Sequence, residues 1–203
     1  MKPWLKLSIL ALIAAVSVVI AFFFDAPVHT WIETHQSDAA RAFMQNISRF
    51  GDWPEHVALG LMFAGLAWLR GNKKWTRIFL SMLIACALAG VAARVIKIAA
   101  GRARPSVKTE EIWNGPSLSS RYHAFPSGHT AASAAFFGVL LFVSVRIGCA
   151  CLPIPLLIGF SRMYVAAHYF SDVVFAAFLG FLCALIVVRW LLSTDRRPSS
   201  STL

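Results

Sequence analysis

Three separated stretches of the chain carry side chains whose types and spacing suit chemistry: fixed cations, histidines, a hydroxyl and a carboxylate. In chain order they are Lys97-x6-Arg104-Pro105, Pro126-Ser127-Gly128-His129 and Ser161-Arg162-x5-His168-x3-Asp172. Cations are costly inside an apolar chain unless they are paired or bind an anion. Together these side chains predict a site that holds a phosphate group and transfers it.

The cations have the types that a phosphate requires. Transfer of a phosphoryl group needs positive charge around its non-bridging oxygens, and arginine forks bind such oxygens in pairs. We therefore expect Lys97, Arg104 and Arg162 to bind the phosphate. Because the residue before a proline avoids the helical conformation, Arg104 should lie on irregular chain and turn inward. Arg102 is expected to be a neighbouring surface charge.

The second stretch precedes an apolar segment and therefore predicts the amino terminus of a helix. The free N–H groups and partial positive charge of such a terminus favour an anion. Gly128 allows the backbone to approach the anion closely, and the Ser127 hydroxyl can donate a further hydrogen bond. His129 at the edge of the site can protonate a leaving oxygen. The nearby His123 is expected to be a surface loop residue.

The third stretch suits covalent catalysis by a histidine. His168 and Asp172 are four residues apart, which makes them neighbours on a helical turn. A carboxylate bonded to one imidazole nitrogen fixes the tautomer and leaves the other nitrogen free to attack. We expect His168 to be the nucleophile and Asp172 its orienting partner. Arg162 and His168 are about 240° apart on an ideal helix, so both can face one ligand only if the helix ends or bends between them.

The sequence predicts no cofactor. No cluster of carboxylates and histidines has metal-ligand spacing, and the cations of the protein can supply the charge that a metal would provide. The cysteines lie inside or beside apolar runs, so we expect packing residues rather than a zinc site or a disulfide framework. They are Cys86, Cys149, Cys151 and Cys183.

The composition indicates a membrane protein. Hydrophobic residues make up 58% of the 203 residues and charged residues only 14%. A water-soluble core of this size cannot hide so much apolar surface, and the length fits one domain over residues 1–203. The formal net charge of +10 is spread between apolar runs, so it does not indicate a nucleic-acid partner.

The apolar runs predict an all-α fold with six transmembrane helices. A spanning helix needs about 20 predominantly apolar residues. The first run follows Lys2 and Lys6 but is too long for a signal peptide and lacks a small-residue cleavage site, so we expect a retained helix. The expected spans are residues 4–24, 54–71, 76–96, 129–147, 150–168 and 172–193.

The distribution of Lys and Arg predicts the orientation of these spans. Basic residues collect at the amino terminus, in the turn between the second and third spans, and around the carboxy-terminal tail, where Arg189, Arg196 and Arg197 lie. Both termini are therefore expected to be cytoplasmic. All three chemical stretches then fall at the outer face of the membrane. The loop at 97–128 is itself basic, and we expect its cations to serve the site.

Two loops of the outer face have features of their own. In the first loop, residues 25–53, apolar residues recur at helical spacing from Ala39 to Phe50, and Ser37-Asp38 can cap the start of a helix. This pattern indicates a short interfacial helix, which either anchors the chain or helps to admit a lipid. The second loop, residues 106–125, is expected to select the substrate.

The three motifs, in this order and at these spacings, resemble the signature of the type 2 phosphatidic acid phosphatase family. Every signature position is matched over residues 97–172, and the expected spans extend the likeness to most of the chain. The resemblance implies a metal-independent membrane lipid phosphatase that forms a phosphohistidine. It implies that His168 is the nucleophile, His129 the general acid and Asp172 the partner of the nucleophile. It also implies that the phosphate is bound by Lys97, Arg104, Ser127, Gly128 and Arg162.

The resemblance leaves several activities open. Integral bacterial members act at the periplasmic face of the inner membrane, so hydrolysis of a lipid phosphate or diphosphate is the leading interpretation. The same phosphohistidine can instead pass its group to a lipid acceptor. A vanadate-dependent haloperoxidase has a similar site but is soluble and larger, and a lipid-binding or transport protein would not need His129, His168 and Asp172.

The implied mechanism leads to further expectations. The candidate substrates are phosphatidic acid, phosphatidylglycerol phosphate, undecaprenyl diphosphate and lipid A phosphates. Activity should survive chelators, because side chains supply the positive charge. The pH profile should be bell-shaped, because His168 must be neutral while His129 must be protonated.

Overall fold

The computed structural model describes residues 2–107 and 109–192. Within these residues the chain is helical, with no strand and one isolated bridge between Arg102 and Trp113, so the predicted all-α class is confirmed. Arg196 and Arg197, on which the predicted orientation partly rested, lie outside the described residues. The α-helices are α1 (Pro3–Phe23), α2 (Asp25–His35), α3 (Asp38–Arg49), α4 (Trp53–Leu69), α5 (Lys73–Ala100), α6 (Gly128–Val143), α7 (Val145–Cys151), α8 (Pro153–Tyr164) and α9 (Phe170–Val187). A 3₁₀ turn, η1 (Ser120–Tyr122), and a terminal π-helical turn, η2 (Val188–Leu192), complete the described chain.

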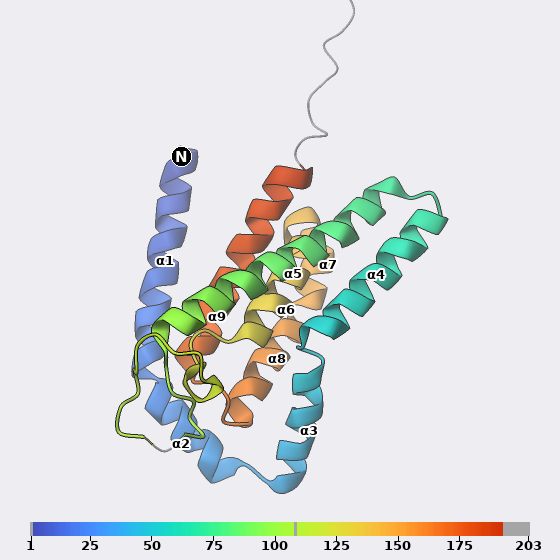
Figure 1. Cartoon of the computed structure of the whole chain (residues 1–203). Coiled ribbons are helices and arrows are strands. Elements are labelled where there is room, and N and C mark those ends of the chain that lie inside the picture. Colours follow the sequence, from blue (N-terminus) through green and yellow to red (C-terminus); the bar gives the residue numbers. More distant parts are fainter. Residues whose placement is uncertain (1, 108, 193–203) are drawn as a thin grey trace, which may run out of the picture.

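Helices α5, α6 and α9 form the centre of the molecule, with α1 against α9 and α4 against α5 (Figure 1). The innermost helix is α6, in which every residue of 130–140 is buried. Small residues let its neighbour approach closely: a Cβ added at Gly180 of α9 would lie 2.5 Å from the carbonyl oxygen of Ala131. Such contacts between small residues are typical of helices packed within a membrane, where close backbone approach replaces the hydrophobic driving force.

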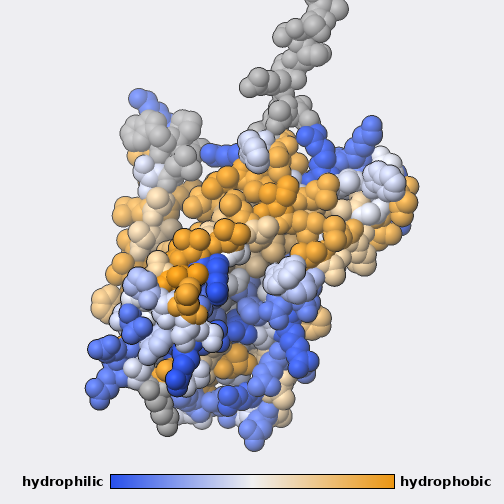
Figure 2. Space-filling model, viewed as in Figure 1, coloured by the Kyte–Doolittle hydropathy of each residue, from blue (hydrophilic) through white to orange (hydrophobic). Residues whose placement is uncertain are grey.

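Several helices have the length and composition needed to cross a membrane. The segments Lys73–Ala100, Val145–Tyr164 and Phe170–Leu192 qualify individually. The pair Ser8–Phe23 and Asp25–His35 adds one candidate that is bent by 53°, and the apolar α6 is shorter. Figure 2 shows the corresponding band of apolar surface between two more polar ends. The predicted count of six spans remains a prediction.

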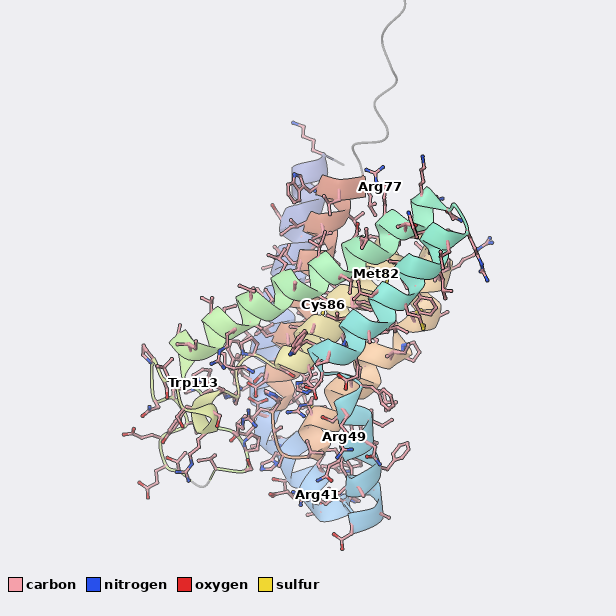
Figure 3. The ribbon with its side chains drawn as sticks, turned by 45° about the vertical axis from the view of Figure 1, so that its right-hand side comes forward. Arg41, Arg49, Arg77, Met82, Cys86 and Trp113 are labelled. Carbon is pink, nitrogen blue, oxygen red and sulfur yellow. The ribbon has the colours of Figure 1, made fainter. Side chains whose placement is uncertain are left out.

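The two ends of the molecule differ in what they carry. The amino terminus of α1, the turn from α4 to α5 and the described end of α9 lie together at one end (Figure 1). Helices α2 and α3 and the loop from α5 to α6 lie at the other end. Arg77 marks the first end and Arg41 and Arg49 the second (Figure 3). The end with α2 and α3 is also where the three sequence motifs meet.

The segment 25–53 contains two helices where the sequence predicted one. Ser37 caps α3 as predicted, with its hydroxyl accepting a hydrogen bond from the Ala40 N–H at 3.2 Å. Helix α2 was not predicted, because its residues mix charged and apolar types without a helical repeat and include Pro27. A proline is tolerated there because it lies in the first turn of the helix.

The predicted span 150–168 also differs from the structure. The chain leaves α6 at Ser144, and α7 already begins at Val145, before α8 continues in the same direction. Helix α8 ends at Tyr164, several residues earlier than the apolar pattern indicated. The apolar pattern continued because Val165, Ala166 and Ala167 are apolar although they follow the helix, and Ala167 is buried in the connection to α9.

The long loop between α5 and α6 folds back on itself. Its Ala103 N–H donates to the Ile112 carbonyl at 2.8 Å, and the Asn114 N–H donates to the Gly101 carbonyl at 2.9 Å. A further bond from the Ser117 N–H to the carbonyl of Ile98 ties the loop to α5 at 2.9 Å. These bonds fix the backbone from which the cations after α5 extend.

We expect Gly101→Ala to destabilise this loop. Gly101 ends α5 with φ 57° and ψ 44°, and a Cβ added there would lie 1.6 Å from the Gly115 carbonyl oxygen. The left-handed conformation alone costs a non-glycine residue about 1–2 kcal/mol. Displacing the Gly115 backbone should add about 1–3 kcal/mol, as overpacking does elsewhere. The midpoint of thermal unfolding in detergent measures the loss.

Gly71→Ala is the matched control for this substitution. Gly71 also has a positive φ, of 69°, but an added Cβ meets nothing within 4 Å. It should therefore show only the conformational cost and not the clash. Equal shifts of the unfolding midpoint in the two variants would contradict the close contact between Gly101 and Gly115.

Candidate active site

His168 lies in the short connection between α8 and α9. Helix α8 ends at Tyr164, and Ala166 has a left-handed φ of 54°, so the helix ends between Arg162 and His168 as their spacing required. The imidazole is buried, and its Nδ1 lies 2.6 Å from the Ala124 carbonyl oxygen. Because a carbonyl oxygen only accepts, Nδ1 carries the proton and Nε2 keeps its lone pair.

Asp172 lies in the first turn of α9 and is fully buried. Its Oδ2 accepts a hydrogen bond from the Tyr169 N–H at 2.7 Å and lies 3.7 Å from Nδ1 of His168. The nearer partner of that nitrogen is the Ala124 carbonyl. Asp172 is thus close enough to stabilise positive charge on the ring, while the carbonyl fixes the tautomer.

Burial sets the protonation state of His168. It lowers the pKa of the imidazole to about 4, and the hydrogen bond and charge of Asp172 only partly oppose that shift. Near neutral pH the ring is therefore uncharged, which is the form in which an imidazole nitrogen can attack.

Three cations predicted to bind phosphate lie in one neighbourhood. Lys97, Arg104 and Arg162 come from α5, the following loop and α8, and they are close enough to interact electrostatically. Nη1 of Arg162 donates to the Ser48 hydroxyl at 2.5 Å, which fixes one end of its guanidinium. Nζ of Lys97 lies 3.5 Å from the position that a Cβ of Gly128 would occupy.

Both arginines of this cluster have donors that an anion can use. The Nε atoms of Arg104 and Arg162 are buried and have no hydrogen-bond partner among the described residues. A buried donor without a partner costs free energy, and an acceptor at that position recovers it. Burial also lowers the pKa of Arg104, although an arginine remains cationic at neutral pH. The cluster is therefore arranged to accept a small anion rather than being paired internally.

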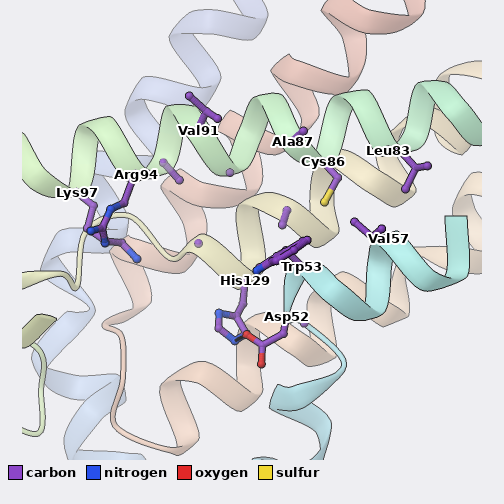
Figure 4. Close-up of a pocket in the computed structure, with 15 residues that line it drawn as sticks. Asp52, Trp53, Val57, Leu83, Cys86, Ala87, Val91, Arg94, Lys97 and His129 are labelled. Atoms are coloured by element: carbon purple, nitrogen blue, oxygen red, sulfur yellow. Dashed lines mark ion pairs between the residues drawn. The ribbon is translucent and has the colours of Figure 1, made fainter. Parts of the chain in front are cut away.

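His129 belongs to the start of α6. Its Nε2 lies 2.6 Å from Oδ1 of Asp52, a residue of the turn between α3 and α4, and Figure 4 shows this pair at one side of a cleft. Burial, followed by the charge of Glu55, raises the pKa of Asp52. His129 also interacts electrostatically with His168, so the two imidazoles share one site. Asp52 was not among the predicted site residues, because no spacing in the sequence links it to α6.

Ser127 and Gly128 form the amino terminus of α6, as the sequence predicted. Ser127 is the N-cap, and its hydroxyl accepts hydrogen bonds from the Thr130 N–H at 3.5 Å and the Thr130 hydroxyl at 2.9 Å. The Ser127 side chain is wholly buried. Gly128 lies between this cap and the Lys97 ammonium.

A cleft of about 450 Å³ runs from these residues along α4 and α5 (Figure 4). Lys97, His129 and Asp52 line its polar end. The rest of the lining is mainly apolar and includes Val57, Leu83, Cys86, Ala87 and Val91. The cleft thus joins a charged end, suited to a phosphate, to an apolar wall that lies mainly on α5, a helix long and apolar enough to cross a membrane.

Two expectations about loop residues were wrong. Arg102 is 3% exposed rather than a surface charge, and its guanidinium bonds to Asp25 and Asp172. His123 is also 3% exposed, with its Nε2 2.9 Å from the Ser117 carbonyl oxygen. The partners of Arg102 come from segments distant in sequence, whereas His123 contacts Ser117 of its own loop and Arg94 of α5.

The described residues contain no group of three or more His, Cys, Asp or Glu side chains arranged to hold a metal ion. The predicted independence from a metal remains a prediction.

The PAP2 superfamily model matches residues 78–196, more than half of the chain. The lipid A 1-phosphatases of Rhizobium etli and Rhizobium johnstonii are each 27% identical to the chain over 184 residues. These alignments cover 82% of the chain and 78% and 74% of the two relatives.

Solved structures share the fold. The PAP2-type phosphatidylglycerolphosphate phosphatase of Bacillus subtilis superposes with a TM-score of 0.71 at 21% identity, covering 98% of this chain and all of that one. LpxE of Aquifex aeolicus superposes with a TM-score of 0.66 at 20% identity, covering 82% of this chain and 96% of that one. With the apolar helices, these matches indicate an integral membrane protein. The chain belongs to the PAP2 superfamily.

Proposed function

We propose that this protein hydrolyses a lipid phosphate monoester or diphosphate through a phosphohistidine formed on His168. The observation that carries the proposal is the state of His168: buried, uncharged, with Nδ1 bonded to the Ala124 carbonyl and Nε2 left as the nucleophile. It lies in a site that also contains Lys97, Arg162 and a second histidine. Family membership supports the same chemistry.

In the first step, Nε2 of His168 attacks the phosphorus. The new N–P bond forms as the bond from phosphorus to the lipid oxygen breaks, and the leaving oxygen takes a proton from the protonated ring of His129. Lys97, Arg104 and Arg162 stabilise the charge on the non-bridging oxygens. The ring of His168 becomes positively charged in this step, because Nδ1 keeps its proton. Asp172, 3.7 Å from that nitrogen, stabilises the charge.

In the second step, water replaces the lipid at phosphorus. His129, now uncharged, takes a proton from the water as its oxygen bonds to phosphorus, and the N–P bond breaks. Inorganic phosphate leaves, and His168 returns to its starting form. The Asp52 carboxylate at 2.6 Å can stabilise the protonated His129 in both steps.

The cleft supports a lipid as the substrate. A phosphate at Lys97 and His129 would place the attached group along the apolar wall between α4 and α5. The similarity to lipid A 1-phosphatases makes a lipid A phosphate the first candidate. We further propose a single domain over residues 1–203 in a bacterial inner membrane. Its termini would be cytoplasmic, and the site would face the periplasm or exterior.

We expect the acid limb of the pH profile to lie well below the ordinary range of histidine. Attack requires the neutral ring, and burial lowers the pKa of His168 from 6.5 to about 4. The neutral form therefore persists as the pH falls from 7, and the rate of phosphoenzyme formation should decline about tenfold per pH unit only below the lowered pKa. Single-turnover rates across the acid range measure this. A decline that begins near 6.5 would contradict the burial of His168.

Release of phosphate by the purified protein tests the proposed function. The substrates are phosphatidic acid, phosphatidylglycerol phosphate, undecaprenyl diphosphate and a lipid A phosphate, each assayed with and without EDTA. We expect release from at least one lipid, unchanged by EDTA. No release from any of them, or a strict requirement for Mg²⁺, would overturn the proposal. Adding an acceptor lipid and following labelled phosphate distinguishes hydrolysis from transfer.

A further inference from the structure

Arg102, which the proposed mechanism does not use, makes more side-chain hydrogen bonds than the other described cations near the site. Its Nη1 donates to Oδ1 of Asp172 at 2.5 Å and to the Ser171 hydroxyl at 2.8 Å, and its Nη2 donates to Oδ2 of Asp25 at 2.7 Å. The guanidinium also lies 4.2 Å from the centre of the Tyr169 ring, within range of a cation–π interaction. Arg102 therefore has a single defined position between two carboxylates.

Asp25 reaches the site from the bend between α1 and α2. Its Oδ1 accepts a hydrogen bond from the Ser171 N–H at 2.7 Å, and its Oδ2 accepts one from the Ser171 hydroxyl at 2.6 Å. The first four N–H groups of a helix have no partner within the helix, and Ser171 supplies one of them for α9. A carboxylate there is also favoured by the helix dipole. Asp25 thus holds the start of α9, the turn that carries Asp172.

The charges of this cluster have a consequence for His168. Asp25, Arg102 and Asp172 are all buried, and together they carry a net charge of one negative. Without Asp25, the charge of Arg102 would largely cancel that of Asp172. With Asp25 in place, Arg102 can hold Asp172 firmly while a negative charge remains beside the imidazole.

We infer that Arg102 and Asp25 are positioning residues for the nucleophile: they hold Asp172 so that its charge stabilises His168 when the ring becomes cationic. This inference rests on the proposed phosphohistidine chemistry. Neither residue belongs to the cation cluster of Lys97, Arg104 and Arg162. Loss of either should therefore impair the covalent step and leave phosphate binding intact.

The test compares Asp25→Asn and Arg102→Gln with the unmodified protein. Asparagine keeps the shape of Asp25, and its carbonyl can still accept from the Ser171 N–H, so the change removes the charge and the hydrogen bond that Arg102 donates. We expect kcat to fall roughly ten- to hundredfold, as when a partner that orients a reactive group is lost. The inhibition constant of inorganic phosphate should change by less than about threefold.

A second measurement does not depend on knowing the lipid. Orthovanadate resembles the phosphoryl transition state and can bond to Nε2 of His168, whereas inorganic phosphate engages only the cations. Both affinities are measured by calorimetry on the same detergent-solubilised samples. Each variant should bind vanadate roughly tenfold more weakly and bind phosphate as before.

Matched controls come from exposed residues outside the site. Glu33→Gln on α2 and Arg146→Gln on α7 each remove one charge of the same sign, and both residues are exposed. Neither should change kcat or vanadate binding. Because Asp25 and Arg102 act as one unit, the double variant should lose little more activity than the more impaired single variant.

The outcomes separate the two hypotheses. If the unmodified protein releases no phosphate from any lipid, the proposed function fails, and the vanadate measurement still judges the role of Asp25. If Asp25→Asn keeps both kcat and vanadate affinity, the inference is wrong even though the enzyme is active. If Arg102→Gln does not fold, as loss of a buried pair partner can cause, Arg102→Lys and Asp25→Asn carry the test. Equal weakening of vanadate and phosphate binding would show a structural role only and would also overturn the inference.

Discussion

His168→Ala is expected to abolish the release of phosphate from lipid, with a loss in kcat on the order of 10⁴-fold or more. The structure places this buried ring beside Asp172, with Nδ1 fixed by the Ala124 carbonyl, so no other described side chain of the site is equally prepared to attack phosphorus. Water admitted to the vacated volume would lack both the position and the nucleophilicity of the imidazole. Phosphate release from the best lipid of the panel measures the loss.

Trapping of the covalent intermediate is a second measurement on the same variant. A rapid quench with labelled substrate should trap an acid-labile, alkali-stable phosphoenzyme in the unmodified protein and none in His168→Ala. Binding of inorganic phosphate should persist, because the cations are unchanged. His35→Ala is the control: His35 lies exposed on α2 with its Nδ1 near the Trp31 carbonyl, and its loss should leave turnover intact. Full turnover by His168→Ala would rule out the proposed intermediate.

His129→Ala is expected to slow the two halves of the reaction to different extents. General acid catalysis contributes roughly 10²–10⁴-fold when the leaving group is a poor one, such as a lipid alkoxide. An aryl phosphate needs little help, because its leaving phenolate is already stable. We therefore expect a large loss with the lipid and a smaller loss in the first step with p-nitrophenyl phosphate.

The aryl ester also makes the second step, hydrolysis of the phosphoenzyme, measurable. Without His129 as a base for water, the phosphoenzyme should accumulate, and p-nitrophenol should appear as a burst that matches the amount of enzyme before slow turnover. The lipid and the aryl ester serve as controls for each other within one variant. If the rate fell equally with both esters and no burst appeared, His129 would be neither the acid nor the base of the reaction.

The helical class and the common end at which the motifs lie could be predicted from the sequence, because both depend on local patterns along the chain. Motif spacing carries local information: the proline after Arg104 predicted irregular chain, and Ser127 predicted the start of α6. Ser37 likewise predicted the start of α3. The alternation of apolar runs and motifs placed the motifs at a common end. The catalytic roles of these residues remain predictions that the variants above test.

The residues that sequence reasoning missed depend on contacts between distant segments. In the sequence, Arg102 is one of several cations in a loop. Its contacts with Asp25 and Asp172 form only when the chain folds. Asp52 is similarly an ordinary loop acid until the turn before α4 packs beside His129. Neither Asp25 nor Asp52 lies within the part of the chain that matches the family model. A signal that could have found them is the cost of a buried, unpaired cation, which requires some carboxylate nearby.

The position of the cleft between α4 and α5 determines which concentration of substrate sets the rate of this protein, the bulk concentration or the concentration in the membrane surface. Its apolar wall, with Val91 64% exposed, lies mainly on α5, which is long and apolar enough to cross a membrane, so a lipid can reach the charged end by moving sideways within its leaflet. The protein then encounters its substrate in two dimensions. Its rate should depend on the mole fraction of that lipid in the surface, and dilution with an inert lipid should slow it even when the bulk amount of substrate is constant.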